Sequence, residues 1–128
     1  MPKPRKTLHI KLPSYAAPKL TWREAILKAL RAAKKAGGVT FDRSDRLALD
    51  IRLYLVDRRL DRIDVDNRLK DIMDALQGQV GGQRKKVMYP TNPIISNDCQ
   101  VWRVTIEKSE RPPNLSATAG GHLTISRL

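Results

Sequence analysis

The sequence predicts a single α/β domain of the α+β type, in which two helices pack on a small mixed β-sheet of about four strands. Three observations predict this fold class. The length of 128 residues is typical of one domain. Apolar residues recur at every second position in some segments and at every third or fourth position in others. These segments follow the order strand, helix, strand, helix, strand, strand, and packing helices on a sheet buries both kinds of apolar face.

Four segments have the alternation of a β-strand. Residues 7–12 and 47–56 alternate apolar and other side chains, as a strand with one buried face does. The second face of residues 47–56 is also partly apolar, so we expect this strand to lie inside the sheet. Shorter alternating patterns in residues 101–106 and 122–128 predict the last two strands.

Two segments have helical periodicity. After Trp22, apolar residues lie three and four positions apart, which predicts an amphipathic helix with Trp22 in the core. Thr21 and Glu24 form a capping box, which predicts that this helix begins at Thr21. Residues 65–77 have the same periodicity and predict the second helix. The polar side of the first helix is basic and is expected to face solvent or nucleic acid: Arg23, Lys28, Arg31, Lys34 and Lys35.

The remaining segments are expected to be irregular. Residues 1–6 predict a basic tail. Residues 77–97 contain glycines, two prolines and a basic triplet, and residues 109–121 are rich in Pro, Ser, Ala and Gly. Both therefore predict long loops, and a loop as long as 77–97 is often functional.

The charge indicates the class of partner. The chain has 25 Lys and Arg against 13 Asp and Glu, a net charge of +12. This surplus favours a polyanionic partner such as nucleic acid, although solubility alone is a second interpretation. No apolar run is long enough to span a membrane, and no apolar signal segment follows the basic N-terminus. With a single cysteine, these features predict a reducing cytoplasm and no membrane partner.

Four aspartates against two cations occupy residues 64–74 of this basic chain. Asp64 and Asp66 are two positions apart, which in extended chain puts their side chains on the same side, with Cα atoms roughly 6.5 Å apart. Such a pair can bind Mg²⁺, which prefers oxygen ligands. Lys70 comes one helical turn after Asp66 and can stand beside the same site. In the alternative interpretation, one aspartate caps the helix and pairs with a neighbouring arginine.

The run Asp64-Val65-Asp66-Asn67-Arg68-Leu69-Lys70-Asp71-Ile72-Met73-Asp74-Ala75-Leu76 resembles the signature of the RusA-type Holliday junction resolvases. A basic turn precedes it, with Arg58, Arg59 and Arg62. A second motif of the family, an aspartate followed by Gln and an apolar residue, is matched by Asp98-Cys99-Gln100-Val101. The resemblance covers most of residues 45–107 and, more loosely, 7–36.

The resemblance implies a function. By this resemblance, Asp64, Asp66 and Asp98 are expected to bind metal and take part in catalysis. Lys70 is expected to be the active-site lysine, and Asn67 and Asp74 are expected to support the site. The family consists of homodimers that use Mg²⁺ or Mn²⁺ to cut two opposed strands of a four-way DNA junction symmetrically. This implies a role in DNA recombination and repair, in a bacterium or phage. The sequence departs from the family at Asn97, where a second aspartate is common, and in the length of the 77–97 loop.

Basic residues near these motifs are expected to hold the DNA backbone: Arg58, Arg59, Arg62, Arg84, Lys85 and Lys86. Two other functions remain open, which are a non-catalytic architectural protein that binds nucleic acid or junctions and a metal-dependent nuclease for another branched DNA or RNA. Cys99 is expected to be a buried strand residue. Trp102 is expected in the core or at a dimer interface, with base stacking as the alternative.

Overall fold

The computed structural model describes residues 6–13, 19–55, 65–78, 82–83, 86–87, 94–95, 98–110 and 119–128. Its elements follow in the order β1 (Thr7–Pro13), α1 (Lys19–Gly37), β2 (Leu47–Leu55), α3 (Val65–Leu76), β3 (Gly82–Gln83), β4 (Lys86–Val87), the 3₁₀ turn η1 (Asp98–Gln100), β5 (Val101–Glu110) and β6 (Ala119–Arg127).

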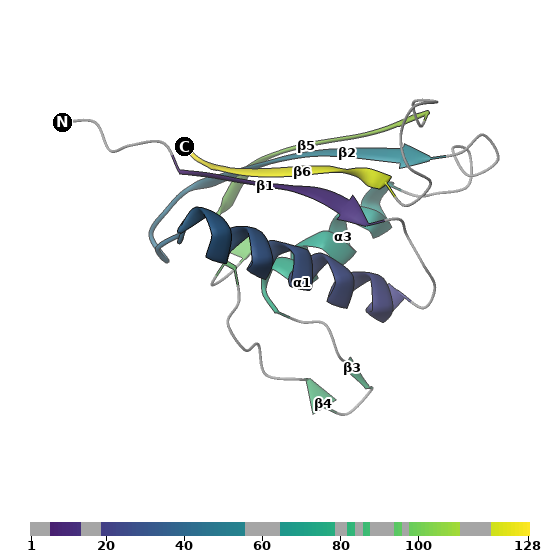
Figure 1. Cartoon of the computed structure of the whole chain (residues 1–128), viewed down its shortest axis with the longest axis horizontal. Helices are drawn as coiled ribbons and strands as arrows, with labels where there is room; N and C mark the ends of the chain where they lie inside the picture. The colour runs from purple at the N-terminus through teal and green to yellow at the C-terminus, as the bar shows by residue number, and fades with distance from the viewer. Residues whose placement is uncertain are drawn as a thin grey trace.

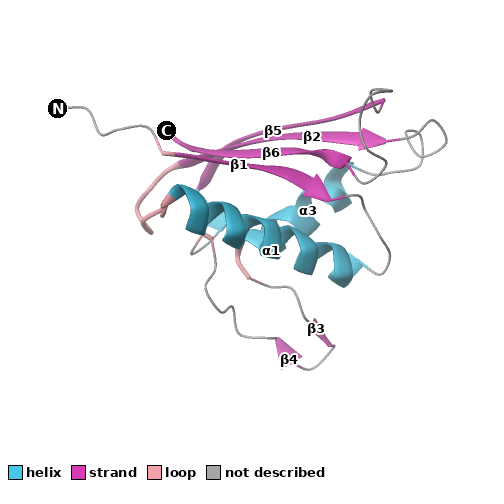
Figure 2. Ribbon diagram, viewed as in Figure 1, coloured by secondary structure: helices cyan, strands magenta, loops and turns pink. Residues whose placement is uncertain are grey.

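Four of the strands form one mixed sheet in the order β1-β6-β2-β5. β6 is antiparallel to both β1 and β2, whereas β2 and β5 are parallel and α3 lies in the connection between them. Both helices lie on the same face of the sheet (Figures 1 and 2). The predicted α+β class is confirmed, and so is the inner position of the strand that begins at Leu47, because β2 has β6 on one side and β5 on the other.

The core lies between the helices and this face of the sheet. The alternating residues of β1 and β2 contribute one side of it, and the apolar faces of α1 and α3 contribute the other. Trp22 is buried as predicted, and its indole Nε1 donates a hydrogen bond to the Pro13 carbonyl oxygen at 2.8 Å. The largest fully buried side chains of the core are Leu12, Trp22, Ile26, Leu30, Leu47, Leu49, Ile51, Ile72, Leu76, Ile95, Leu123 and Ile125.

Ile94 and Ile95 belong to this core although the sequence placed them in a loop. Both side chains are buried, and both backbone N–H groups donate to the Leu76 carbonyl oxygen, at 2.8 and 3.1 Å. A carbonyl in the last turn of a helix has no partner within the helix. This segment therefore closes the C-terminal end of α3 while it fills the core.

Several boundaries differ from the predictions. α1 begins at Lys19, so Thr21 lies inside the helix and is not its N-cap; Lys19 and Leu20 are both good helix formers, which permits the earlier start. The predicted loop 109–121 is shorter, because β5 continues to Glu110 and β6 begins at Ala119. Within residues 77–97, β3 and β4 pair with each other in antiparallel register.

Of the predicted tail, the structure describes Lys6 alone. Residues 1–5 lie outside the described part of the chain. Lys6 is attached to the sheet end, because its carbonyl oxygen accepts from the Arg127 N–H at 3.0 Å and its Nζ lies 3.8 Å from Asp45 Oδ2.

A β-bulge interrupts the pairing of β5 with β2. Leu47 pairs with Val101 and the next residue, Ala48, pairs with Arg103, so Trp102 has no partner in the register. An extra residue of this kind locally re-aims the side chains of a strand. Trp102 is 63% exposed, so it does not lie in the core, and its place at a dimer interface stays a prediction.

In the part of the chain that the structure describes, neither helix combines the length and the apolar character that crossing a bilayer requires.

Candidate functional site

The acidic motif lies at the N-terminal end of α3. Asp66 is in the first helical turn, and Lys70 follows one turn later; both are exposed, as is Asn67 between them. A carboxylate is favoured at this end because the helix dipole is positive there. Asp64 lies outside the described residues, so its position relative to Asp66 stays a prediction.

The other two aspartates of the motif face α1 and are partly or fully buried. Arg23 Nη2 lies 2.9 Å from Asp71 Oδ1 and 2.9 Å from Asp74 Oδ2, and Arg23 Nε donates to Asp71 Oδ1 at 3.0 Å. Arg68 adds a longer contact, with Nη2 3.6 Å from Asp71 Oδ2. Asp74, expected to support the site, therefore joins the two helices. Arg23, expected on the outer face of its helix, is buried between them because both carboxylates require a cation.

Asp98 lies in η1, directly before β5, and is exposed. The Gln100 side chain is buried, and its Nε2 donates to the carbonyl oxygens of Asp42 and Asp45 at 2.7 and 3.1 Å. Gln100 of the second motif thus ties η1 to the loop before β2. Cys99 is exposed in the same turn, which overturns its predicted burial in a strand.

The structure does not bring Asp66 and Asp98 together within one chain. Val101, which follows η1, pairs with Leu47 at the beginning of β2, whereas α3 follows the end of β2 (Figure 1). α3 then runs back under the sheet for 12 residues, or roughly 18 Å. Asp66 and Asp98 therefore lie at opposite ends of the crossover. The described residues also contain no group of three or more His, Cys, Asp or Glu side chains able to hold a metal ion.

Most of the basic residues predicted to bind DNA cannot be placed. Arg58, Arg59, Arg62, Arg84 and Lys85 lie outside the described residues. Lys86 is in β4, where only the backbone is described. Their contribution to DNA binding stays a prediction.

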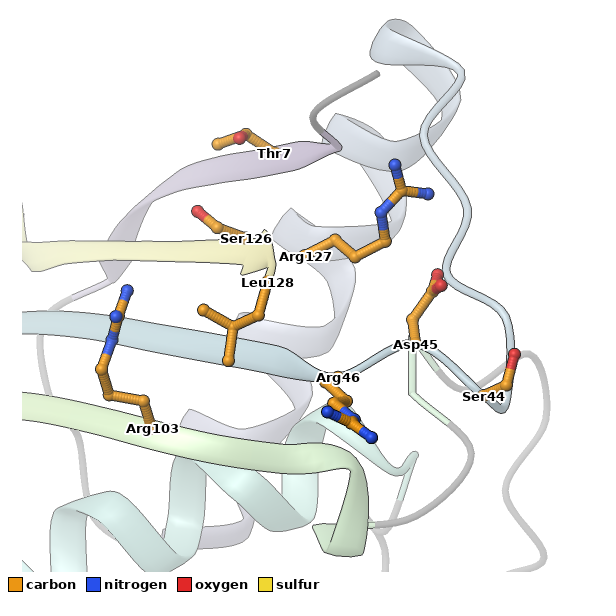
Figure 3. Close-up of a pocket in the computed structure, with 8 residues that line it drawn as sticks. All are labelled: Thr7, Ser44, Asp45, Arg46, Arg103, Ser126, Arg127 and Leu128. Carbon is orange, nitrogen blue, oxygen red and sulfur yellow. The ribbon is translucent and has the colours of Figure 1, made fainter. Parts of the chain in front are cut away.

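A basic pocket that the sequence did not predict lies at the end of the sheet near η1. It has a volume of about 740 Å³, and three arginines line it: Arg46 from the loop before β2, Arg103 from β5 and Arg127 from β6 (Figure 3). A second pocket of about 340 Å³ shares Arg46 with it and extends to Trp102 and Cys99. The three arginines are far apart in the sequence, and only the strand order brings them together, so no local pattern could have indicated them.

The helix-free face of the sheet carries two stacked histidines, for which the sequence indicated no role. The rings of His9 and His122 are stacked with centroids 5.3 Å apart, His9 Nδ1 is hydrogen-bonded to Thr124 Oγ1 at 2.8 Å, and Tyr54 contacts His122 edge-on. Burial lowers the pKa of His122 below its ordinary value, and the nearby charges of His9, Lys11 and Arg52 lower it further. The His122 ring therefore favours the neutral state.

Comparison with known proteins adds no relative. No protein-family model matches the sequence, and a search of curated proteins also finds no match.

Proposed function

We propose that the chain is a Mg²⁺-dependent, structure-selective endodeoxyribonuclease of the RusA type, which resolves four-way (Holliday) DNA junctions by symmetric phosphodiester hydrolysis. The observation that carries the proposal is that the aspartates of α3 have two different environments. Asp71 and Asp74 bind Arg23, whereas Asp66, to which the resemblance assigns chemistry, is exposed with Lys70 one turn away. The net charge of +12 supports a nucleic-acid substrate.

The proposed chemistry depends on oxygen ligands and one lysine. Mg²⁺ bound by carboxylates supplies an activated water and polarises the phosphate oxygens. Lys70 would stabilise the negative charge that develops on the scissile phosphate. Asp66 would hold the metal together with Asp64 and Asp98 in the expected ligand set, and Mn²⁺ is expected to substitute for Mg²⁺.

One chain does not fit this ligand set, because Asp66 and Asp98 lie at opposite ends of the β2-α3-β5 crossover. The proposed homodimer resolves the conflict if the Asp98 end of one copy meets the Asp66 end of the other. Two such sites related by a two-fold axis suit a junction with two equivalent strands to cut. The proposed enzyme would act in recombination and repair in the cytoplasm of a bacterial cell, encoded by the bacterium or a phage.

The same separation favours a second candidate function. If Asp66 and Asp98 never meet, the exposed aspartates are surface residues, and the chain is an architectural protein that binds nucleic acid or junctions without cutting them. This candidate predicts binding that weakens steeply with salt and no product in any metal.

Cleavage of a labelled four-way junction separates these candidates. The parent, Asp66→Asn and Asp50→Asn would be compared in Mg²⁺, Mn²⁺ and EDTA; Asp50 is an exposed carboxylate on the helix-free face of β2 and is the matched control. Paired nicks that require both metal and Asp66, but not Asp50, would support the resolvase. Binding without nicks in either metal would support the architectural protein. Flap DNA, duplex DNA and RNA in the same assay would identify a nuclease with a different substrate.

A mixing experiment tests the shared site. Asp66→Asn and Asp98→Asn would each be inactive alone. If the two carboxylates of a site come from different copies, a mixed dimer has one site with both substitutions and one site with none. Activity would then return on mixing, to about a quarter of the parent's sites, since half of randomly mixed dimers have one intact site. Two inactive variants that stay inactive after verified subunit exchange would contradict the shared site.

A further inference from the structure

The end of the sheet near η1 concentrates positive charge. Three arginines line the larger pocket, and Asp45 is the one acidic side chain among the described residues of that lining. The Asp45 carboxylate already accepts from the Asp42 N–H at 2.9 Å and lies 3.8 Å from Lys6 Nζ. Neither Arg46 nor Arg103 forms a salt bridge with a carboxylate of the described residues. Guanidinium groups without carboxylate partners attract an external anion.

The bulge in β5 places two side chains of different chemistry next to each other. It leaves Trp102 without a strand partner and aligns Arg103 with Ala48 and, through Ala48, with Ser126 of β6. Ala48 has the smallest side chain that L-residues offer, and the Leu128 side chain, which also lines the pocket, lies between Ser126 and Arg103 in Figure 3. The bulge thereby exposes an indole and aligns Arg103 with Ser126, which lies two strands away on the same helix-free face.

Arg46 connects the two pockets. Its guanidinium carbon lies 4.3 Å from the centroid of a Trp102 ring, a cation–π contact. Arg46 is also fixed by its backbone, since its carbonyl oxygen accepts from the Leu128 N–H at 2.8 Å. The hydrogen bonds of Gln100 to the loop before β2 hold the opposite wall in place. The two pockets share Ser44, Asp45 and Arg46 and together form one groove that extends from Arg127 to Trp102. Hydrogen bonds fix its walls, which reduces the entropy lost on binding.

We propose that this groove binds the phosphodiester backbone of a single nucleic-acid strand, with Arg46, Arg103 and Arg127 holding phosphates and Trp102 stacking on an adjacent base. Arginine suits phosphate because its planar donors match two oxygens at once. An exposed tryptophan beside a basic groove is the arrangement by which proteins hold unpaired strands without reading their sequence. The inference rests on the nucleic-acid-binding part of the proposed function and does not depend on cleavage.

The test measures binding of a short single-stranded DNA by fluorescence anisotropy in EDTA. Arg103→Gln and Arg46→Gln should each weaken binding several-fold and reduce the slope of log K against log salt by about 0.7. Trp102→Ala should weaken binding about 5- to 100-fold. Lys11→Gln, which removes one exposed charge at a distance from the groove, is the matched control and should change the Kd by less than about twofold. Circular dichroism would confirm that each variant is folded.

Tryptophan fluorescence gives a second readout. Trp22 is buried and Trp102 is exposed, so quenching by bound bases reports on Trp102. The quenching should be lost in Trp102→Phe, in which Trp22 is the one remaining tryptophan. Binding of inorganic phosphate, measured in place of DNA, distinguishes a site for a nucleic-acid strand from a site for a free anion. Phosphate binding that depends on Arg103, with DNA binding that does not, would overturn the strand site in favour of a free-anion site.

The remaining outcomes separate this inference from the proposed cleavage. In one outcome, the parent cuts junctions and the arginine and tryptophan variants bind DNA as tightly as the parent. This would contradict the proposed binding groove and leave the proposed nuclease function unaffected. A parent that binds through the groove without cutting would do the reverse, and a parent that binds no nucleic acid would overturn both. Loss of a dimer in Trp102→Ala, with unchanged DNA binding per chain, would assign Trp102 to a protein interface.

Discussion

Arg23 of α1 lies between Asp71 and Asp74 of α3, with its Nη2 atom 2.9 Å from an oxygen of each carboxylate. The Arg23 and Asp71 side chains are 11% and 4% exposed, so water screens this contact little. Two of the four aspartates in residues 64–74 therefore hold the two helices together.

This contact predicts a large loss of stability on removing one charge. Asp71→Asn leaves Arg23 buried with one carboxylate, and breaking a buried ion pair in this way costs about 3–5 kcal/mol. Urea unfolding measures the loss. Glu107→Gln is the control, because the Arg52–Glu107 pair is 54% exposed on both sides and such pairs contribute about 0–1 kcal/mol. Similar losses in both variants would show that the buried pair is screened.

Gly121 predicts a second loss with a different cause. A Cβ atom at this position would lie 1.9 Å from the Arg52 carbonyl oxygen of the neighbouring strand, and the φ angle is +142°. Gly121→Ala should therefore destabilise the protein by more than 1 kcal/mol, or prevent folding. Gly37→Ala, at the end of α1 with its nearest contact at 3.7 Å, should be neutral or slightly stabilising. Thermal unfolding of both variants measures the difference, and an unchanged midpoint in Gly121→Ala would show that β6 can move away from β2.

His122 predicts a loss of stability as the pH falls. Its pKa in the folded protein is lower than the ordinary value of 6.5, chiefly because of burial. Below pH 6.5 the unfolded chain binds a proton at His122, whereas the folded chain does not. The free energy of unfolding therefore decreases as the pH decreases, until the pH passes below the pKa of His122 in the folded protein. The free energy of unfolding, measured in urea at pH values spaced by about one unit between roughly pH 5 and pH 8, gives this slope. His122→Gln should make the slope shallower; an identical slope would assign it to other groups.

Lys70 predicts a change in rate without a change in binding. Removal of one positive group that stabilises transition-state charge typically lowers kcat about 10²- to 10³-fold. Lys70→Ala should therefore cut junctions that much more slowly with a nearly unchanged Kd, whereas Asp66→Asn should abolish cutting and bind as tightly as the parent or more tightly. Single-turnover cleavage and anisotropy measure the two quantities. A normal rate in Lys70→Ala would contradict a role for Lys70 in the proposed chemistry.

The fold was predictable because the alternating and helical patterns of this chain are strong, and each element buries one face. The site was less predictable. Nothing in the spacing of Asp66 and Asp98 indicates that β2 and β5 are parallel, and this parallel pairing sets the two residues apart. Ile94 and Ile95 follow a proline within a polar stretch, so their burial under α3 has no periodic signal.

The phase of the β5 pattern did contain a signal. Val101 and Val104 are three positions apart, whereas an unbroken strand face requires an even number. Both pair with core residues of β2, Leu47 and Leu49, so an extra residue must lie between them. That residue is Trp102, which is exposed. Because Trp102, Val104 and Ile106 also alternate without a break, the sequence alone could not show which residue is the extra one.

The position of β6 between β1 and β2 has a consequence for synthesis on the ribosome. β1 and β2 do not pair with each other, because β6, which comes last in the sequence of the sheet, lies between them. Until residues 119–127 leave the exit tunnel, the nascent polypeptide exposes the edges of β1 and β2 that β6 covers in the folded sheet, and exposed strand edges are prone to associate with other chains. We therefore expect the apolar sheet to close after translation of β6, and the growing chain to be a substrate for chaperones until then.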